Sequence, residues 1–205
     1  MTDGENIEKN NNISGAGSVW DERYANNPWP TEPNESLVEL AQSLSPKKAI
    51  DFGCGTGRNS IYLASLGWDV TGVDGSVVGL EIAQQKAKEN NLKLTTIHAD
   101  LTDFVPKENY YDLAVMSYIH FDKQTLKGVV TKTVSSLAAG GYLYIVGHHV
   151  SDLGKTGPPS PELLYELKDL DKVDKINVIT LAEIKKDYED GTFNTDVLLI
   201  GTKIG

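Results

Sequence analysis

Residues 51–59, DFGCGTGRN, decide the fold of this chain. Their three glycines, Gly53, Gly55 and Gly57, stand between an apolar run typical of a strand and a run with helical spacing. Glycines in such a turn let a ligand approach the backbone without Cβ atoms in the way. The first amides of the following helix face the same ligand, which suits a carboxylate or a phosphate. The stretch therefore predicts a ligand-binding turn, with a merely tight strand-to-helix connection as the alternative.

The spacing of these glycines differs from that of the dinucleotide-binding fingerprint. The chain has GxGxG, whereas the fingerprint is GxGxxG and would need its last glycine at position 58. Arg58 occupies that position. An NAD-dependent oxidoreductase is therefore disfavoured, and nicotinamide binding would be needed to revive that interpretation.

Strand-like and helical runs alternate along residues 47–147. The strand-like runs lie at 47–52, 69–74, 94–99, 111–118 and 141–147, and helical runs lie at 58–66, 76–90 and 123–138. Strict alternation of this kind predicts a parallel sheet with helices on both faces. Residues 175–204 then hold two β-rich runs separated by Glu189, Asp190 and Gly191, which is typical of a hairpin. The predicted fold class is α/β, a doubly wound, Rossmann-like, mostly parallel seven-stranded sheet with a C-terminal antiparallel hairpin.

Length and charge narrow the class of protein. A chain of 205 residues is long enough for one well-buried domain and too short for two of ordinary size. The net charge is −10, and the densest basic runs are only pairs of lysines. Such a field repels a polyanion, so nucleic acid is not expected as a partner.

The N-terminal residues 1–18 are polar and rich in Asn and Gly, which predicts a disordered tail. They lack the basic start and apolar core of a signal peptide. No apolar run approaches the ~20 residues needed to span a bilayer. The single cysteine, Cys54, excludes an internal disulfide, which suits a reducing compartment. These observations predict a cytoplasmic protein that does not act at a membrane.

Two aspartates follow the second and third predicted strands. Asp74 ends the second strand, where a carboxylate in a doubly wound fold reaches the ribose hydroxyls of an adenosine ligand. A helix cap is the alternative, although Ser76 competes for that role. Asp100 stands at the end of the third strand, where it is placed to accept from an adenine amino group while the backbone of Leu101 meets the ring edge. A solvated turn aspartate is the alternative for Asp100.

These elements, in this order, resemble the class I S-adenosylmethionine-dependent methyltransferases. The matching pieces are AIDFGCGTG, VTGVD, HADL, YYDLAVMSY and LAAGGYLYIV. The stretch GCGTGRNSIYLASLGWDVTGVD is most similar to the small-molecule branch that includes tellurite-resistance and thiopurine methyltransferases. The upstream VWDERYANNPW resembles the aromatic segment that covers the cofactor in that branch. The resemblance implies S-adenosyl-L-methionine as the cofactor.

The resemblance also implies which residues bind this cofactor. Gly53 and Gly55 would give backbone contacts to the methionyl portion, and Asp51 would lie near its amino group. Ser117 falls where a backbone carbonyl of the family holds the same amine. The full implied set is Trp20, Tyr24, Asp51, Gly53, Gly55, Asp74, Asp100, Leu101 and Ser117.

Three aromatic residues, Trp20, Tyr24 and Trp29, lie in a proline-flanked stretch that is expected to be irregular up to about Glu35, where a helix begins. We expect this segment to be a mobile lid that closes over the bound cofactor and excludes water. A fixed strap packed over the sheet edge is the alternative.

Four candidates for acid–base chemistry follow the fourth and fifth strands, namely Tyr118, His120, His148 and His149. Ligands bind at that edge of open α/β sheets. Methyl transfer depends mainly on alignment, and a general base is needed only where the acceptor must lose a proton. A hydrogen-bonded loop residue is the alternative for each histidine. The adjacent His148 and His149 lack a partner with ligand-like spacing, so no metal is predicted.

The acceptor is expected to be a small molecule. Enzymes that methylate amino groups of DNA bases or glutamine amides carry an Asn/Asp-Pro-Pro-Tyr type motif after the fourth strand, where this chain reads SYIHF. The Gly- and Pro-rich stretch VSDLGKTGPPSPELLY is expected to form part of the acceptor pocket. The alternative function is a non-catalytic sensor or partner protein that binds S-adenosylmethionine.

The predicted domain organisation is a disordered tail at residues 1–18 and a single methyltransferase domain at residues 19–205. Within that domain, residues 19–45 form the lid and a helix, residues 47–147 form the cofactor-binding core, and residues 148–205 form the acceptor loop and the closing hairpin.

Overall fold

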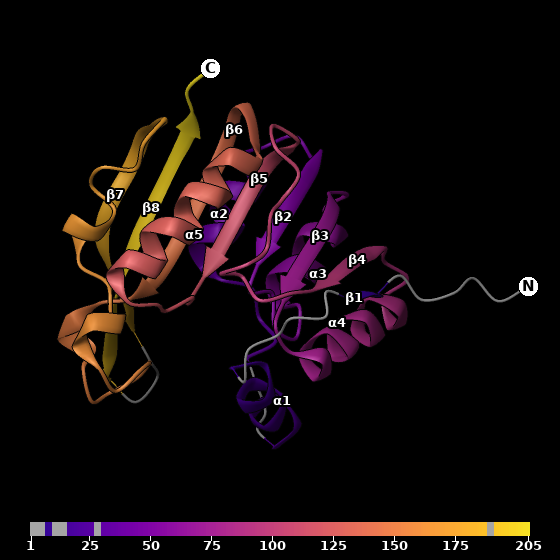
Figure 1. Cartoon of the computed structure of the whole chain (residues 1–205), viewed down its shortest axis with the longest axis horizontal. Helices are drawn as coiled ribbons and strands as arrows, with labels where there is room; N and C mark the ends of the chain where they lie inside the picture. The colour runs from indigo at the N-terminus through magenta and orange to yellow at the C-terminus, as the bar shows by residue number, and fades with distance from the viewer. Residues whose placement is uncertain (1–6, 10–15, 27–29, 188–190) are drawn as a thin grey trace, which may run out of the picture. The chain divides into compact units, whose positions relative to one another are not determined.

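The computed structural model describes residues 7–9, 16–26, 30–187 and 191–205. The chain forms two compact units, of which the first ends at Phe104 and the second begins at Val105. The first unit contains β1 (Ile7–Lys9), α1 (Ala16–Asn26), α2 (Glu35–Gln42), β2 (Lys48–Phe52), α3 (Arg58–Ser65), β3 (Asp69–Asp74), α4 (Val77–Glu89) and β4 (Leu94–His98) (Figure 1).

The strands of the first unit are all parallel, in the order β1-β4-β3-β2. Four of the five residues of β2 are buried, as expected of a parallel strand that is covered on both faces. The register places Phe52 beside Val73, and Asp74 beside His98. The carboxyl ends of the three strands therefore meet at one edge, where the glycine loop follows β2.

Side-chain caps fix the helices around this edge. The Ser76 hydroxyl accepts a hydrogen bond from the backbone N–H of Gly79 and so begins α4. Asn34 begins α2 in the same way by accepting from the backbone N–H of Ser36. The backbone N–H of Asn34 also donates to the side chain of Asn59, which joins the start of α2 to α3.

The second unit contains two parallel strands and an antiparallel hairpin. Its elements are β5 (Tyr111–Ser117), α5 (Lys123–Ser136), β6 (Leu137–His148), three short 3₁₀ helices (Val150–Asp152, Pro161–Leu163 and Leu167–Asp169), β7 (Ile176–Asp187) and β8 (Phe193–Lys203). Strand β6 is parallel to β5, and β8 lies antiparallel between β6 and β7. Helix α5 packs against β5 and β6 (Figure 1). Fully buried Leu143, Tyr144, Ile145 and Leu199 form the centre of its core.

The structure confirms the predicted alternation of strands and helices and the closing hairpin. In the hairpin, β7 and β8 pair over most of their lengths, and Gly191 has the positive φ that its turn requires. Glu189 and Asp190 of that turn lie outside the described residues. Strand β6 begins at Leu137, where a helix was expected to continue.

The expectation of an irregular segment between the tail and Glu35 is wrong for residues 19–26, which lie in α1. This helix lacks a periodic apolar face, so no helical pattern marks it in the sequence. Asp21 instead joins it to the start of α4. Strand β1 lies inside the stretch expected to be a disordered tail.

The remaining expectations for the N-terminal region and the domain organisation stay predictions. Most of residues 1–18, and Trp29 of the expected lid, lie outside the described residues. No described helix is both long enough and apolar enough to cross a membrane. The single domain and the cytoplasmic location also stay predictions.

Candidate functional site

The glycine loop after β2 has a backbone that only glycine adopts readily. Gly53, Gly55 and Gly57 have φ values of 68°, 53° and 83°, in the left-handed region. The N–H groups of Gly53 and Cys54 both donate to the carbonyl of Val73, at 2.7 and 3.1 Å. These bonds hold the loop against the end of β3.

The carboxylate of Asp74 joins this loop to the start of α4. One oxygen accepts from the N–H of Gly55 and the other from the N–H of Ser76, each at 2.8 Å. The residue is only 7% exposed. Burial raises the pKa of the Asp74 carboxyl, and the two backbone hydrogen bonds oppose that shift. Asp74 therefore organises the loop as well as ending the strand.

A second buried carboxyl, that of Asp51, lies at the end of β2. The Ser60 hydroxyl donates to it at 2.6 Å. Burial raises the pKa of Asp51 to about 7, while the Ser60 hydrogen bond and the positive charge of Arg58 act in the opposite direction. A carboxyl of this kind is suited to gain a cationic partner, because such a partner relieves the cost of ionisation. The neighbouring Cys54 thiol is buried with its pKa raised, so it is not a reactive thiolate.

Asp100 and Leu101 follow β4 as the sequence predicts. One oxygen of Asp100 accepts from both the N–H and the hydroxyl of Thr102, at 2.8 and 2.7 Å. Leu101 is buried. Asp100 thus organises the turn after β4, at the same sheet edge as Asp74.

Helix α1 lies over the glycine loop. A Cβ added to Gly55 would stand 2.6 Å from the Tyr24 hydroxyl oxygen, so Tyr24 fills the space directly beside this glycine. Burial raises the pKa of the Tyr24 hydroxyl, and nearby carboxylates add to the shift. Trp20 stacks on Tyr24 with ring centroids 5.7 Å apart. Asp21 accepts from the hydroxyl of Ser76 at 2.5 Å, which anchors the helix beside the loop.

The second unit brings three of the four acid–base candidates together. Tyr118 and His148 have ring centroids 4.6 Å apart, and His120 stacks on His148 at 5.4 Å with an interplanar angle of 7°. Tyr118 has a φ of 57°, an uncommon conformation for a residue with a side chain. Asp196 of β8 connects two of them, because it accepts from the Tyr118 hydroxyl at 2.7 Å and binds His148 Nδ1 at 3.0 Å.

His120 is neutral near pH 7. Its Nδ1 lies 2.9 Å from the carbonyl oxygen of Leu163, so Nδ1 carries the proton and donates it. Its Nε2 is buried and has no hydrogen-bond partner among the described residues. Burial lowers the pKa of His120 to about 4, and the neighbouring His148 adds to the shift.

His149 does not join this cluster. Its Nδ1 caps the 3₁₀ helix at Val150–Asp152 by accepting from Ser151, and its Nε2 lies 3.6 Å from a carboxylate oxygen of Glu183. Ser117 is the last residue of β5, next to Tyr118, and is half-buried.

The loop expected to form the acceptor pocket contacts the cluster directly. A Cβ on Gly157 would stand 2.6 Å from Cδ2 of His148, so this glycine lets the loop lie against the imidazole. The Tyr165 hydroxyl donates to the carbonyl of Ile119 at 2.6 Å, and its ring fills the space beside Gly147. The loop therefore holds the ends of β5 and β6 together.

Sequence reasoning missed Asp196. It is the acidic residue that immediately precedes the apolar run VLLI in β8, and it is buried. A charged residue in a strand with buried neighbours needs a partner, which is a usable signal. The sequence does not show which partner it meets, because the pairing of β8 with β6 decides that.

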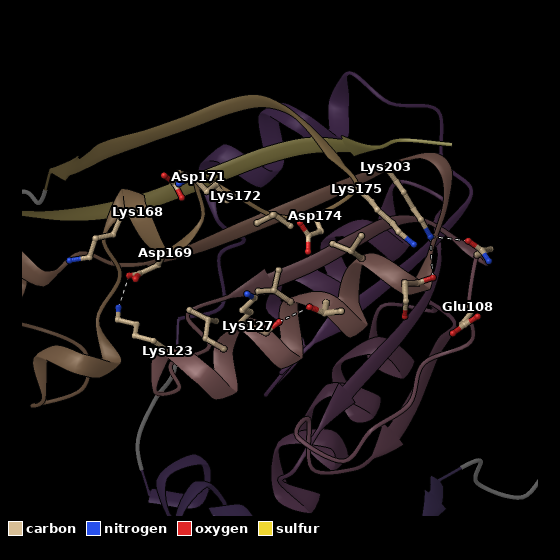
Figure 2. Close-up of a pocket in the computed structure, with 17 residues that line it drawn as sticks. Glu108, Lys123, Lys127, Lys168, Asp169, Asp171, Lys172, Asp174, Lys175 and Lys203 are labelled. Carbon is tan, nitrogen blue, oxygen red and sulfur yellow. Dashed lines mark hydrogen bonds and ion pairs between the residues drawn. The ribbon is translucent and has the colours of Figure 1, made fainter.

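A separate cavity of about 710 Å³ lies along α5 in the second unit (Figure 2). None of the residues predicted for the site lines it. Several of its lysines already have partners. Lys123 binds Asp169 (Figure 2). Lys203 donates to the side chain of Asn109 and to the carbonyl of Leu137.

No group of three or more His, Cys, Asp or Glu residues within the described ranges is arranged to hold a metal ion. The expectation that the protein uses no metal stays a prediction.

Comparisons with known proteins place the chain in a family. The model of the family "Tellurite resistance protein TehB" matches residues 19–158, more than half of the chain. The probable S-adenosyl-L-methionine-dependent methyltransferase TehB of Haemophilus influenzae (strain 10810) is 29% identical over 117 residues, which cover 57% of this chain and 41% of that protein. The chain thus spans less than half the length of this curated relative.

Solved structures show the same fold. The crystal structure of TehB from Haemophilus influenzae superposes with a TM-score of 0.70 at 22% identity, covering 91% of this chain and 66% of that one. The N-methyltransferase NodS from Bradyrhizobium japonicum WM9, solved in complex with S-adenosyl-L-homocysteine, superposes with a TM-score of 0.74 at 16% identity. The match covers 93% of this chain and 99% of that one. These likenesses confirm the Rossmann-like fold of S-adenosylmethionine-dependent methyltransferases. Because the family model matches most of its length, this chain belongs to the TehB family of tellurite resistance proteins.

Proposed function

We propose that this protein is a methyltransferase that transfers a methyl group from S-adenosyl-L-methionine to a small-molecule acceptor. The observation that carries the proposal is the buried carboxylate of Asp74, which binds the N–H groups of Gly55 and Ser76. It ties the glycine loop to the start of α4 and holds both in place before a ligand arrives. When bound, S-adenosylmethionine supplies a methyl group already activated on a sulfonium, so the protein has mainly to bind and align.

The side chains around the loop suit the chemical groups of this cofactor. The bare backbone at Gly53 and Gly55 suits the methionyl portion, which needs close approach. The buried carboxyl of Asp51 suits the methionyl ammonium, which would stabilise its charged form. Asp74 is suited to the ribose hydroxyls. We extend the proposal to Asp100 and Leu101 for the adenine, and to Ser117 for the methionyl amine.

We further propose that Trp20 and Tyr24 cover the bound cofactor. The Tyr24 hydroxyl occupies the space beside Gly55, so it has to move when a ligand reaches the loop. Helix α1 is joined to α4 through the hydrogen bonds of Asp21. Rotation of Tyr24, or displacement of α1 with loss of those bonds, therefore accompanies binding.

A small molecule is the acceptor class that the charge favours. The net charge of −10 repels nucleic acid, and the sequence SYIHF after β5 lacks the proline-containing motif of enzymes that methylate DNA bases. The non-catalytic alternative would leave the cluster of Tyr118, His120 and His148 without a chemical role.

The test is turnover. The full chain is incubated with methyl-labelled S-adenosylmethionine and a panel containing thiols, phenols, amines and tellurite, and S-adenosylhomocysteine is quantified. We expect acceptor-dependent formation of S-adenosylhomocysteine with at least one panel member, and none with the Gly55→Val variant. Saturable binding of S-adenosylhomocysteine without turnover of any acceptor would favour the sensor, and absence of binding would refute the cofactor assignment.

A further inference from the structure

The buried carboxylate of Asp196 binds two of the acid–base candidates, one through each of its oxygens. Its Oδ2 accepts from the Tyr118 hydroxyl, and its Oδ1 lies 3.0 Å from Nδ1 of His148. Both oxygens are therefore used within the cluster.

The hydrogen bond to Asp196 selects the tautomer of His148. A carboxylate that already accepts at both oxygens does not donate, so Nδ1 of His148 carries a proton and Nε2 keeps its lone pair. Within the described residues, Nε2 of His148 has no hydrogen-bond partner, and 19% of the side chain is exposed. Gly157 lies against Cδ2, the ring carbon next to Nε2, and leaves room for the imidazole. A free lone pair on a fixed imidazole is what a general base requires.

Several side chains of the second unit face the His148 ring or act on its neighbour His120. Tyr118 faces it from the end of β5, Asp196 faces it from β8, and His120 stacks on it. His120 is neutral, because burial lowers its pKa to about 4, so it adds no second positive charge. Lys123 is the cation whose charge acts on His120, and its ammonium is paired with Asp169. The carboxylate of Asp196 holds the ring through Nδ1, so Nε2 is the nitrogen left to take up a proton.

We propose that His148 removes a proton from the methyl acceptor, that Asp196 is its positioning residue, and that the acceptor therefore carries an O–H, S–H or N–H group. This inference rests on the proposed function. The acceptor atom attacks the methyl carbon, the C–S bond of the sulfonium breaks with its electron pair staying on sulfur, and the acceptor's proton moves to Nε2 of His148. The products are the methylated acceptor, S-adenosylhomocysteine and an imidazolium, which then releases its proton to water.

Asp196→Asn in the full chain tests this assignment. The amide keeps the size of the carboxylate and still accepts from Tyr118, but its NH₂ donates to His148 Nδ1 and moves the ring proton to Nε2. Asp187→Asn, at an exposed aspartate of the same hairpin, is the matched control. Nitrogen NMR of the His148 ring reads the tautomer without any acceptor.

Activity is compared for protic acceptors, such as a thiol and a phenol, and aprotic ones, such as dimethyl sulfide and iodide. We expect Asp196→Asn to lower kcat for protic acceptors by about 10²–10⁴-fold and to leave aprotic ones unchanged. Higher pH, which ionises the acceptor in solution, restores activity to Asp196→Asn, and Asp196→Glu recovers part of it at neutral pH.

The outcomes separate the inference from the proposed function. Equal loss for both acceptor classes, or no loss, overturns the role of His148 while methyl transfer itself stands. If S-adenosylhomocysteine binds and no acceptor is turned over, the proposed function fails, and the NMR data still decide the positioning role. If NMR finds the proton on Nε2 of His148 in the unaltered protein, the positioning role of Asp196 is overturned.

Discussion

The role of Asp74 is tested most sharply by Asp74→Asn. The amide has nearly the size of the carboxylate, but only one of its two ends accepts hydrogen bonds. One of the N–H groups of Gly55 and Ser76 therefore loses its acceptor, at a cost of about 1–3 kcal/mol for a buried donor. Burial disfavours the charged carboxylate and so raises the pKa of Asp74, and the neutral amide avoids that cost, which offsets part of this loss. We expect the melting temperature to fall by about 2–4 °C for each kcal/mol lost.

Cofactor binding should fall more than stability does. A hydrogen bond from a ribose hydroxyl to a charged carboxylate contributes about 1.5–3 kcal/mol, which corresponds to roughly 10- to 150-fold in affinity. Isothermal titration calorimetry with S-adenosylhomocysteine measures this loss at a temperature where the variant remains folded. Asp69→Asn, at the exposed start of the same strand, is the control and should bind like the unaltered protein. An Asp74→Asn variant that is folded and binds with unchanged affinity would refute the ribose assignment.

Three further variants test the glycine loop and helix α1. Gly55→Ala should abolish binding of S-adenosylhomocysteine in calorimetry, because its Cβ would occupy the space that the methionyl portion needs once Tyr24 has moved away. Gly140→Ala, which has a similarly positive φ of 74° but open space around the added Cβ, should bind normally. Asp51→Asn should weaken binding of S-adenosylhomocysteine and yet have a higher melting temperature than the unaltered protein when both are measured at a pH above 7. Burial lifts the folded pKa of Asp51 from 3.8 to about 7, so the unaltered protein loses stability as pH rises through that window and the variant does not; a parallel pH profile for both proteins would contradict this reasoning. Asp21→Ala removes the bonds between α1 and α4, so trypsin should cleave after Arg23 faster than in the unaltered protein, and equal rates would show that α1 is held by other contacts.

The sheet could be predicted from the sequence because its signals are local. The runs that became β2, β3 and β4 are apolar and are separated by stretches with helical spacing, and Ser76 marks the start of α4. Helix α1 was not predicted, because it has no such local signal. It has no apolar stripe, and the hydrogen bonds of Asp21 to α4 depend on residues more than fifty positions away in the chain.

Some contacts in the candidate site could likewise be predicted from the sequence, and others could not. Tyr118, His120 and His148 lie together because they stand at the ends of two neighbouring parallel strands. His149 is adjacent in sequence to His148 but turns to cap a 3₁₀ helix, which only the local backbone decides. Asp196 arrives through the antiparallel pairing of β8 with β6, and no spacing rule in the sequence specifies that register.

The placement of Tyr24 also depends on tertiary structure. Its identity as an aromatic residue near the cofactor loop comes from a resemblance, whereas its position beside Gly55 comes from the docking of α1. The sequence also does not predict that Asp74 accepts from two backbone N–H groups, because that role depends on how the glycine loop and the start of α4 pack together.

The most direct test of the cofactor site is an amide NMR titration of the full ¹⁵N-labelled chain with S-adenosylhomocysteine. We expect the amide signals of Gly53, Gly55 and Ser76 to shift together and to saturate at one ligand per chain. The Tyr24 signals should move with them as the side chain leaves the loop. Unchanged signals for these four residues, or shifts confined to residues that line the cavity along α5, would contradict the assignment of the cofactor to the glycine loop.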